Sequence, residues 1–302
     1  MAPGHPSPRP ASTPWSFLAV GPEETNAEDC RVVALPVPYD GATSYITGTR
    51  EGPRAIIEAS RHLEDYDIEL QREVYRAGIL TLPELEPYVD SPEGMVDRVQ
   101  AAVEPFAMDG KLVVVLGGDH SVSVGAVRAF RSVYPDLSVL YLDAHADLRD
   151  EYMGSRFSHA CTARRIWEEC PLVQVGVRSI SREEMAFVQQ QGLRVYFHDE
   201  GASPVSWDVE EIASNLSGQV YVSIDLDALD PSLMPAVGTP EPGGLDWNSA
   251  IALLRTVCRE RSVVGFDIVE LCPVAGPPSS SFVAAKLAYK LMGYATQKDC
   301  GA

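Results

Sequence analysis

The sequence predicts a single α/β domain built on a parallel sheet with helices on both faces. Short, apolar, β-branched runs alternate with segments that carry apolar residues at helical spacing. No repeat, long linker or change of composition interrupts residues 30–298. Alternating strands and helices form βαβ units, and the sheet of such units is parallel and covered on both faces.

Seven segments are expected to be strands because they are short and β-branched: 30–37, 111–118, 137–144, 172–177, 193–198, 219–226 and 262–270. Seven others carry apolar positions at helical spacing: 52–63, 94–106, 123–134, 182–191, 207–216, 247–260 and 279–295. Residues 1–27 are rich in Pro, Ser, Ala and Glu, which predicts a disordered N-terminal extension. Residues 28–302 are then expected to form a single catalytic domain.

The chain is strongly acidic, with 43 Asp and Glu against 24 Lys and Arg and a formal net charge of -19. This charge repels phosphate backbones and anionic lipid surfaces, so we expect no nucleic-acid partner and no membrane partner. It would attract a small cationic substrate, although keeping the protein soluble explains the charge equally well.

The cysteines and the N-terminus indicate a cytoplasmic protein. The six cysteines form no CxxC pair, so they are expected to be reduced thiols, several of them buried. No apolar run approaches the roughly 20 residues that span a bilayer. The first residues lack the apolar core of a secretory signal.

Two groups of polar residues follow predicted strands. His120 lies in Gly-Gly-Asp-His-Ser after 111–118; alone it is more often structural than a ligand or base. Asp143, His145 and Asp147 alternate along an extended segment, so their side chains share one side. Crowded carboxylates raise one another's pKa unless a cation neutralises them. The alternative is a solvated acidic loop. The small alanines between the polar residues, directly after an apolar strand, argue against that alternative.

Three further candidates lie after later strands. Asp225 and Asp227 share one side at the end of an apolar strand, where two acids are unfavourable without a metal. His159, which follows Ser158, is a further candidate. The alternative is that Ser158 is a helix N-cap and His159 has no functional role. Glu270 closes the last predicted strand, either as a salt-bridge partner or as a receptor for a cationic ligand.

Together these residues predict a metal site. In open parallel sheets, ligands bind beyond the carboxyl ends of the strands, where these motifs collect. Oxygen-rich ligation with some imidazole favours Mn²⁺, with Ni²⁺ and Zn²⁺ as open alternatives. The charge of four carboxylates would balance two divalent ions. The candidate set is His120, Asp143, His145, Asp147, Asp225 and Asp227.

Several segments, in order along the chain, resemble the signatures of the ureohydrolase family, which includes arginase and agmatinase. They are PYDGATSYITGTREGPRAIIEAS, GGDHS, DAHADLRDEY, SHACTARRI, SIDLDALDPSLMPAVGTPEPGGL and GFDIVELCP. The resemblance covers about residues 30–298. It implies a three-layer α/β/α arginase-like fold with a mainly parallel eight-stranded sheet, and a homotrimer or homohexamer.

The resemblance also implies a binuclear manganese site with two Mn²⁺ per subunit. By matching motifs, one ion would be held by His120, Asp143, Asp147 and Asp225. The other would be held by Asp143, His145, Asp225 and Asp227. Asp143 and Asp225 would then bridge the two ions.

The agmatinase branch looks closest, because the loop after the aspartate motif holds Arg149, Asp150 and Glu151, and because Glu241 lies in a similar TPEPGGL segment. We therefore expect hydrolysis of agmatine to putrescine and urea, in an acidic environment that suits the cationic end of agmatine. Glu241 is a candidate substrate-binding residue. The alternatives are guanidinobutyrate, guanidinopropionate, arginine or guanidine as substrate, a single-zinc deacetylase of related fold, and a non-catalytic regulator of polyamine metabolism.

The expected mechanism assigns three catalytic residues. Two metals would lower the pKa of a shared water, which attacks the guanidinium carbon. Glu270 would bind and orient the guanidinium. Asp147 would pass a proton from the nucleophile to the leaving amine. His159 would bind near the substrate and act as the proton shuttle.

Overall fold

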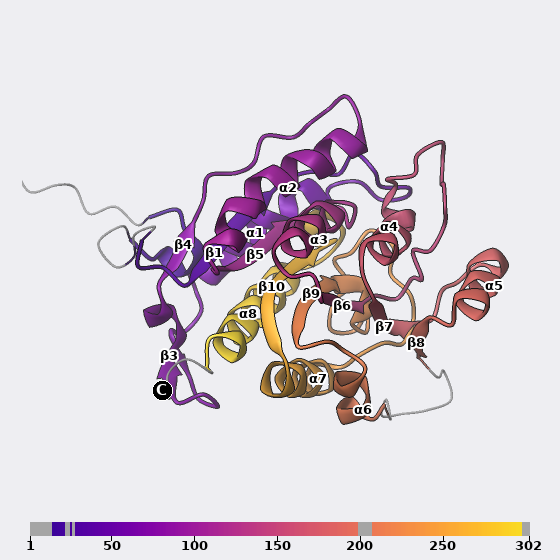
Figure 1. Ribbon diagram of the computed structural model, residues 1–302. Helices are drawn as coiled ribbons and strands as arrows, with labels where there is room; N and C mark the ends of the chain where they lie inside the picture. The colour runs from indigo at the N-terminus through magenta and orange to yellow at the C-terminus, as the bar shows by residue number, and fades with distance from the viewer. Residues whose placement is uncertain (1–13, 22–24, 26–27, 199–206, 298–302) are drawn as a thin grey trace, which may run out of the picture.

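The computed structural model describes residues 14–21, 25, 28–198 and 207–297. Its centre is an eight-stranded sheet in the order β4-β1-β5-β10-β9-β6-β7-β8 (Figure 1). Every pair of neighbouring strands in this sheet is parallel. The predicted α/β class and mainly parallel eight-stranded sheet are confirmed.

All seven strands predicted from the sequence are present. The strands of the sheet are β1 (Val32–Val37), β4 (Ile79–Thr81), β5 (Leu112–Gly117), β6 (Ser138–Leu142), β7 (Leu172–Val177), β8 (Arg194–Phe197), β9 (Gln219–Asp225) and β10 (Ser262–Val269). The strand missed was β4, because its three residues at the sheet edge are too short to show a pattern. A small antiparallel hairpin, β2 (Tyr66–Asp67) with β3 (Arg72–Glu73), was also missed.

The helices are α1 (Gly52–Ser60), α2 (Pro92–Met108), α3 (Val122–Val133), α4 (Thr162–Glu169), α5 (Arg182–Gln191), α6 (Val209–Ser214), α7 (Trp247–Glu260) and α8 (Pro278–Ala295). Several begin at a residue whose side chain accepts a hydrogen bond from the first turn, as Ser91, Ser181 and Asp246 do. The sequence did not predict α4, because TARRIWEE carries few apolar positions.

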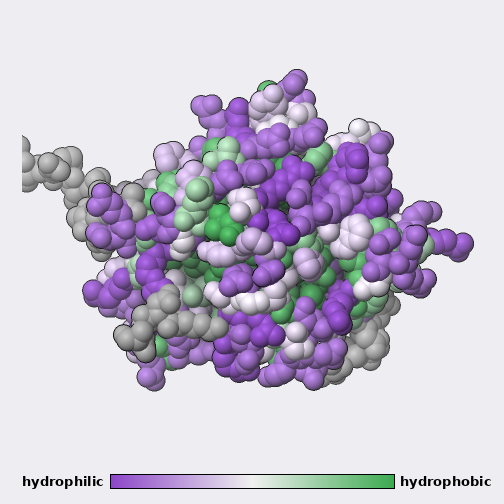
Figure 2. Space-filling view, viewed as in Figure 1, coloured by the Kyte–Doolittle hydropathy of each residue, from purple (hydrophilic) through white to green (hydrophobic). Residues whose placement is uncertain are grey.

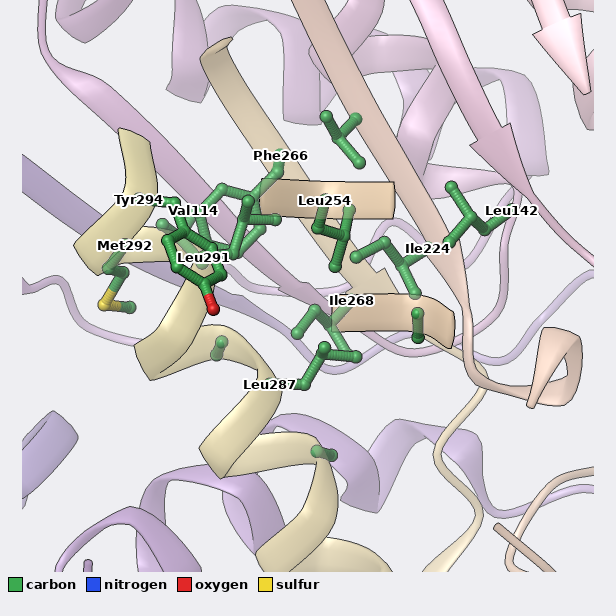
Figure 3. Packing of buried hydrophobic residues seen from close by; sticks show 14 of the residues in the cluster. Val114, Leu142, Ile224, Leu254, Phe266, Ile268, Leu287, Leu291, Met292 and Tyr294 are labelled. Carbon is green, nitrogen blue, oxygen red and sulfur yellow. The ribbon is translucent and has the colours of Figure 1, made fainter. Parts of the chain in front are cut away.

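Helices cover both faces of the sheet and enclose two cores. Val114 and Leu116 of β5 belong to the core under α1, α6, α7 and α8, whereas Val113 and Val115 belong to the core under α2, α3 and α4. Figure 3 shows part of the first core, with side chains from β5, β6, β9, β10, α7 and α8. Because both faces of β5 are buried, its sequence is continuously apolar rather than alternating.

Part of the predicted N-terminal extension packs on the domain. Phe17 is fully buried in the first core, with its ring centroid 6.4 Å from that of Tyr289. The backbone N–H of Phe17 donates to Thr81 Oγ1 at 2.9 Å. Residues 14–21 therefore belong to the packed structure. Residues 1–13, 22–24, 26 and 27 lie outside the described residues, so the predicted boundary at residue 27 stays a prediction.

An ion-pair network ties the segment after β2 to the C-terminal helices. Lys290 Nζ lies 2.6 Å from Glu69 Oε2 and 3.1 Å from Asp67 Oδ1. Tyr294 donates to Glu69 at 2.6 Å, and Arg255 donates to it at 2.9 Å. Burial raises the pKa of Glu69, but the hydrogen bonds from Lys290, Tyr294 and Arg255 outweigh burial and lower it to about 2.

The surface is largely hydrophilic where Figure 2 shows it, and the cysteines of the described residues are buried. Figure 2 shows a face that is mostly hydrophilic, with small hydrophobic patches between charged side chains. Among the helices of the described ranges, none combines the length and the apolar character needed to cross a membrane. The cysteines in the described ranges are buried: Cys30, Cys161, Cys170, Cys258 and Cys272.

Candidate metal centre

Four neighbouring strands at the middle of the sheet bring the predicted site residues together. The register aligns Leu116 of β5 with Ile268 of β10, Ile268 with Ile224 of β9, and Ile224 with Leu142 of β6. The polar residues that follow this row, from His120 to Glu270, therefore emerge at one edge of the sheet. This is the carboxyl edge, where open parallel sheets bind their ligands.

His120, Asp143 and Asp147 form the first group that could hold a metal ion. One ligand atom from each lies within 4.8 Å of the others, and all three residues are buried. His120 Nδ1 lies 3.1 Å from Asp143 Oδ2, 3.1 Å from Asp225 Oδ2 and 3.8 Å from Asp147 Oδ2. One imidazole nitrogen thus faces three carboxylates.

Asp143, His145 and Asp227 form the second group. His145 Nδ1 lies 2.9 Å from Asp227 Oδ2 and 3.6 Å from Asp143 Oδ1. Asp143 is common to both groups, so they are adjacent. On the other side of the ring, His145 Nε2 lies 3.6 Å from Glu241 Oε1.

The protonation of His120 indicates what the first group binds. Ser223 Oγ donates to Asp267 Oδ1 at 2.9 Å, so it accepts from His120 Nε2, which is also 2.9 Å away. With its proton on Nε2, a neutral His120 ring presents the Nδ1 lone pair to anionic oxygens. Burial lowers the pKa of His120, but the hydrogen bonds and charges of Asp143 and Asp225 outweigh burial and raise it, so the geometry favours a cation at Nδ1, either a proton or a metal ion.

The carboxylates give the same indication. Burial and mutual repulsion raise the pKa of Asp147, Asp225 and Asp227, because each charge is removed from water beside another. Asp143 Oδ2 is buried without a hydrogen-bond partner. The donor set, oxygen-rich with two imidazoles, fits divalent cations in each group.

Two site carboxylates stand on left-handed backbone, which side chains other than glycine rarely adopt. The φ angle is 51° at Asp147 and 63° at Glu270, and each such residue costs about 1–3 kcal/mol. Glu270 is held by its N–H, which donates to the Gly118 carbonyl, and by Oε1, which accepts from the His120 N–H, both at 2.8 Å. The backbone of Tyr39 packs against Gly118: a Cβ at Gly118 would lie 1.9 Å from the Tyr39 carbonyl oxygen, so only glycine fits at this position.

A cavity of about 190 Å³ opens onto the site and is lined by His145, Asp147, His159 and Asp225 among others. His159 Nε2 lies 2.7 Å from Ser44 Oγ, and Nδ1 lies 3.4 Å from Glu270 Oε1. Burial lowers the pKa of His159, but the nearby carboxylates, Glu270 first among them, outweigh burial and raise it to about 9. The structure thus places His159 between the cavity and Glu270.

Asp150, in the loop after Asp147, forms ion pairs with two arginines. Asp150 Oδ1 pairs with Arg165 at 2.7 Å and with Arg156 at 3.1 Å. Arg149, by contrast, lines the cavity, with its guanidinium carbon 4.8 Å from the Tyr152 ring centroid. Asp150 is not among the residues that line the cavity, because it pairs with arginines of α4 and of the loop before α4.

Sequence reasoning missed two polar residues below the site. The Tyr141 hydroxyl donates to Asp147 Oδ2 at 2.9 Å, and its ring stacks on His120 with centroids 4.5 Å apart. Ser223 is the partner of His120 described above. Tyr141 and Ser223 each lie two residues before a site aspartate, so alternation along the strand already placed them on the same side.

Arg178, after β7, was also missed, and no sequence signal pointed to it. Its guanidinium donates to the carbonyl oxygens of Asp227 at 2.7 Å, Glu241 at 3.1 Å and Gly176 at 3.1 Å. It therefore fixes the backbone of one site aspartate and of the candidate Glu241 to the end of β7.

Comparisons with known proteins agree with this geometry. A model of the arginase family matches residues 30–293. The chain is 41% identical to the N(1)-aminopropylagmatine ureohydrolase of Synechocystis sp., over 89% of this chain and 90% of that protein. It is 39% identical to the agmatinase of Pyrococcus horikoshii, over 88% and 92%.

A solved structure is similar as well. The agmatine ureohydrolase of Thermoplasma volcanium superposes with a TM-score of 0.83 and 31% identity, covering 94% of this chain and 95% of that one. The chain therefore belongs to the arginase family, and it is a ureohydrolase, a hydrolase that acts on linear amidine C–N bonds.

Proposed function

We propose that this ureohydrolase acts on a linear guanidine that ends in an amine: agmatine, giving putrescine and urea, or its N1-aminopropyl derivative. Two relatives near 40% identity carry these two substrates in their names. The aminopropyl derivative was not among the substrates expected from the sequence. The observation that carries the proposal is that residues of both His/Asp groups and His159 line one shared cavity.

The proposed metals are two Mn²⁺. His120, Asp143, Asp147 and Asp225 would hold one, and Asp143, His145, Asp225 and Asp227 would hold the other. The closeness of Asp225 Oδ2 to His120 Nδ1, and the presence of Asp143 in both groups, support shared ligands. When bound, the ions would supply a water nucleophile at neutral pH and stabilise charge at the guanidinium carbon.

Glu270 is the proposed receptor of the guanidinium. Its Oε1 already accepts from the His120 N–H, which leaves Oε2 to accept from the planar, cationic guanidinium. Its burial, at 2% exposure, strengthens such a charge-assisted hydrogen bond. The hydrogen bond from the His120 N–H holds this carboxylate in one orientation, so the substrate carbon would meet the nucleophile in one geometry.

Asp147 and His159 are the proposed proton carriers. Asp147 lines the cavity and is held at Oδ2 by the Tyr141 hydroxyl, so its other oxygen is available to take the nucleophile's proton. His159 lines the same cavity and has a raised pKa, so it is charged near neutral pH and can protonate the leaving amine. Glu241, beside His145, remains a candidate contact for the substrate's amine.

A second candidate substrate is a guanidino acid such as guanidinobutyrate. The lining of the cavity by Arg149 favours it, because a guanidinium there could pair with a substrate carboxylate. The homotrimer or homohexamer and the cytoplasmic location stay predictions.

The test is urea release by Mn²⁺-loaded protein from agmatine, N1-aminopropylagmatine, guanidinobutyrate, guanidinopropionate, arginine and guanidine, with metal content measured on the same sample. We expect two metals per chain and the highest kcat/KM for an amine-ended substrate. An Arg149→Gln variant should leave that activity largely intact. Preference for guanidinobutyrate, abolished by Arg149→Gln, would replace the proposed substrate with the second candidate. No urea from any compound, with both metals bound, would contradict the proposal.

A further inference from the structure

We propose that Ser44 is the proton relay of His159: its hydroxyl holds the imidazole ring and carries protons between Nε2 and the cavity. The inference rests on the proposed role of His159 as the acid for the leaving amine. Ser44 comes from the loop after β1, far in sequence from the histidine it contacts. It lies within the segment PYDGATSYITGTREGPRAIIEAS, in which no sequence pattern indicated a role for this serine.

Both ring nitrogens of His159 are engaged. Nε2 lies 2.7 Å from Ser44 Oγ, and Nδ1 lies 3.4 Å from Glu270 Oε1. A carboxylate only accepts hydrogen bonds, so Nδ1 carries a proton in both charge states of the ring. The proton that the ring gains and loses is therefore the one on Nε2, and Nε2 faces Ser44.

Ser44 has the chemistry and the position for this transfer. A hydroxyl both donates and accepts: it accepts from Nε2–H when the ring is charged and donates to Nε2 when the ring is neutral. Ser44 is half-buried and lines the same cavity as His159 and Asp147. Its oxygen is thus accessible from the space that the substrate occupies.

The loop that presents Ser44 is anchored to the site. Asp119 Oδ2 accepts from the Ala42 N–H at 2.8 Å, and the Ala42 carbonyl accepts from the His159 N–H at 3.3 Å. Asp119 directly precedes His120, the first candidate ligand. The serine hydroxyl and the histidine ring are therefore fixed relative to each other by backbone contacts as well as by their own hydrogen bond.

The proposed step balances as follows. The Nε2–H bond of the imidazolium breaks and its proton passes to Ser44 Oγ. The original Oγ–H proton passes to the nitrogen of the leaving amine, which forms a new N–H bond. The ring ends neutral, the serine ends as a hydroxyl, and the amine leaves protonated.

The first experiment compares Ser44→Ala and Ser44→Thr with Thr43→Ala as the matched control. Thr43 is the neighbouring hydroxyl residue, but its Oγ1 donates to the Asp40 carbonyl at 3.2 Å. For Ser44→Ala we expect kcat to fall about tenfold, the effect of losing one such hydrogen bond, with little change in KM. Ser44→Thr should restore most of the rate, and Thr43→Ala should keep it.

A double-mutant cycle with His159→Asn separates a relay from a merely structural role. If Ser44 acts through His159, Ser44→Ala has little further effect on kcat in the His159→Asn background. An equal fall in both backgrounds, or a wild-type rate for Ser44→Ala alone, overturns the proposal.

A measurement that does not depend on urea release distinguishes failure of the proposed relay from failure of the proposed function. In protein labelled with ¹⁵N-histidine and loaded with diamagnetic Zn²⁺, the His159 signals are assigned from their loss in His159→Asn. We expect the tautomer with the proton on Nδ1 in the neutral ring, and Ser44→Ala should change its population and its titration midpoint. Unchanged His159 signals would overturn the relay even if every substrate assay succeeded.

Discussion

Replacing Arg178 with lysine should uncouple part of the metal centre from the sheet. The guanidinium donates to five carbonyl oxygens from two nitrogens, most closely at 2.7 Å to Asp227 and at 3.1 Å to Glu241 and Gly176. A lysine ammonium donates from one point and cannot reproduce this planar fork. Two of the carbonyls are then left short of a donor, at about 1–2 kcal/mol each, so we expect a loss of about 2–4 kcal/mol of stability.

The assay is urea unfolding of the chelator-treated protein, so that metal binding does not contribute. Arg54→Lys is the matched control, because Arg54 also makes a forked contact, to Glu84, but on the surface. Surface pairs contribute about 0–1 kcal/mol, so this variant should unfold nearly as the wild type does. A titration with Mn²⁺ should show about tenfold weaker binding for Arg178→Lys, since the backbone of Asp227 has lost its anchor. An unfolding free energy for Arg178→Lys within about 0.5 kcal/mol of that of Arg54→Lys would refute the argument.

Two further variants test polar side-chain contacts. The pKa of Glu69 is depressed to about 2, so the stability that its charge supplies is present above its unfolded pKa, near 4.5, and is lost as the pH falls towards 2. Glu69→Gln should therefore lose about 1–2 kcal/mol at pH 7, a value reduced for partial exposure, and the difference should vanish near pH 2. Unfolding curves against pH check this, with Glu73→Gln, whose ion-pair partner Arg76 is exposed, as the control. Tyr141→Phe keeps the stacked ring but removes the hydroxyl that donates to Asp147, so kcat should fall about tenfold with both metals still bound. Steady-state kinetics with metal analysis measure it, and an unchanged kcat would show that this hydrogen bond does not assist Asp147.

Local patterns predicted most of the fold because they report local conformation and burial. The helix bounds 182–191 and 247–260 were predicted as they occur, since capping residues and apolar spacing mark their ends. The short edge strand β4 and the polar helix α4 were missed because neither carries a periodic apolar pattern.

The site was predictable to a different extent. Alternation along extended segments identified Asp143, His145 and Asp147 as a group. The structure brings Asp143 and Asp147 together with His120, and it brings His145 together with Asp143 and Asp227. The same alternation, followed two residues back, would have reached Tyr141. The pairing of Asp150 with arginines was not readable, because it depends on where another helix packs.

By itself, the sequence determined the α/β class, the order of elements along the chain and the types of ligand offered to a metal. These follow from periodicity and residue chemistry, which act over a few positions. Only the tertiary structure decided that β5, β10, β9 and β6 are neighbours, so that the His120 N–H meets Glu270 from 150 positions away. Sheet order arises from the packing of distant segments against two shared cores, and no local pattern specifies which strands become neighbours.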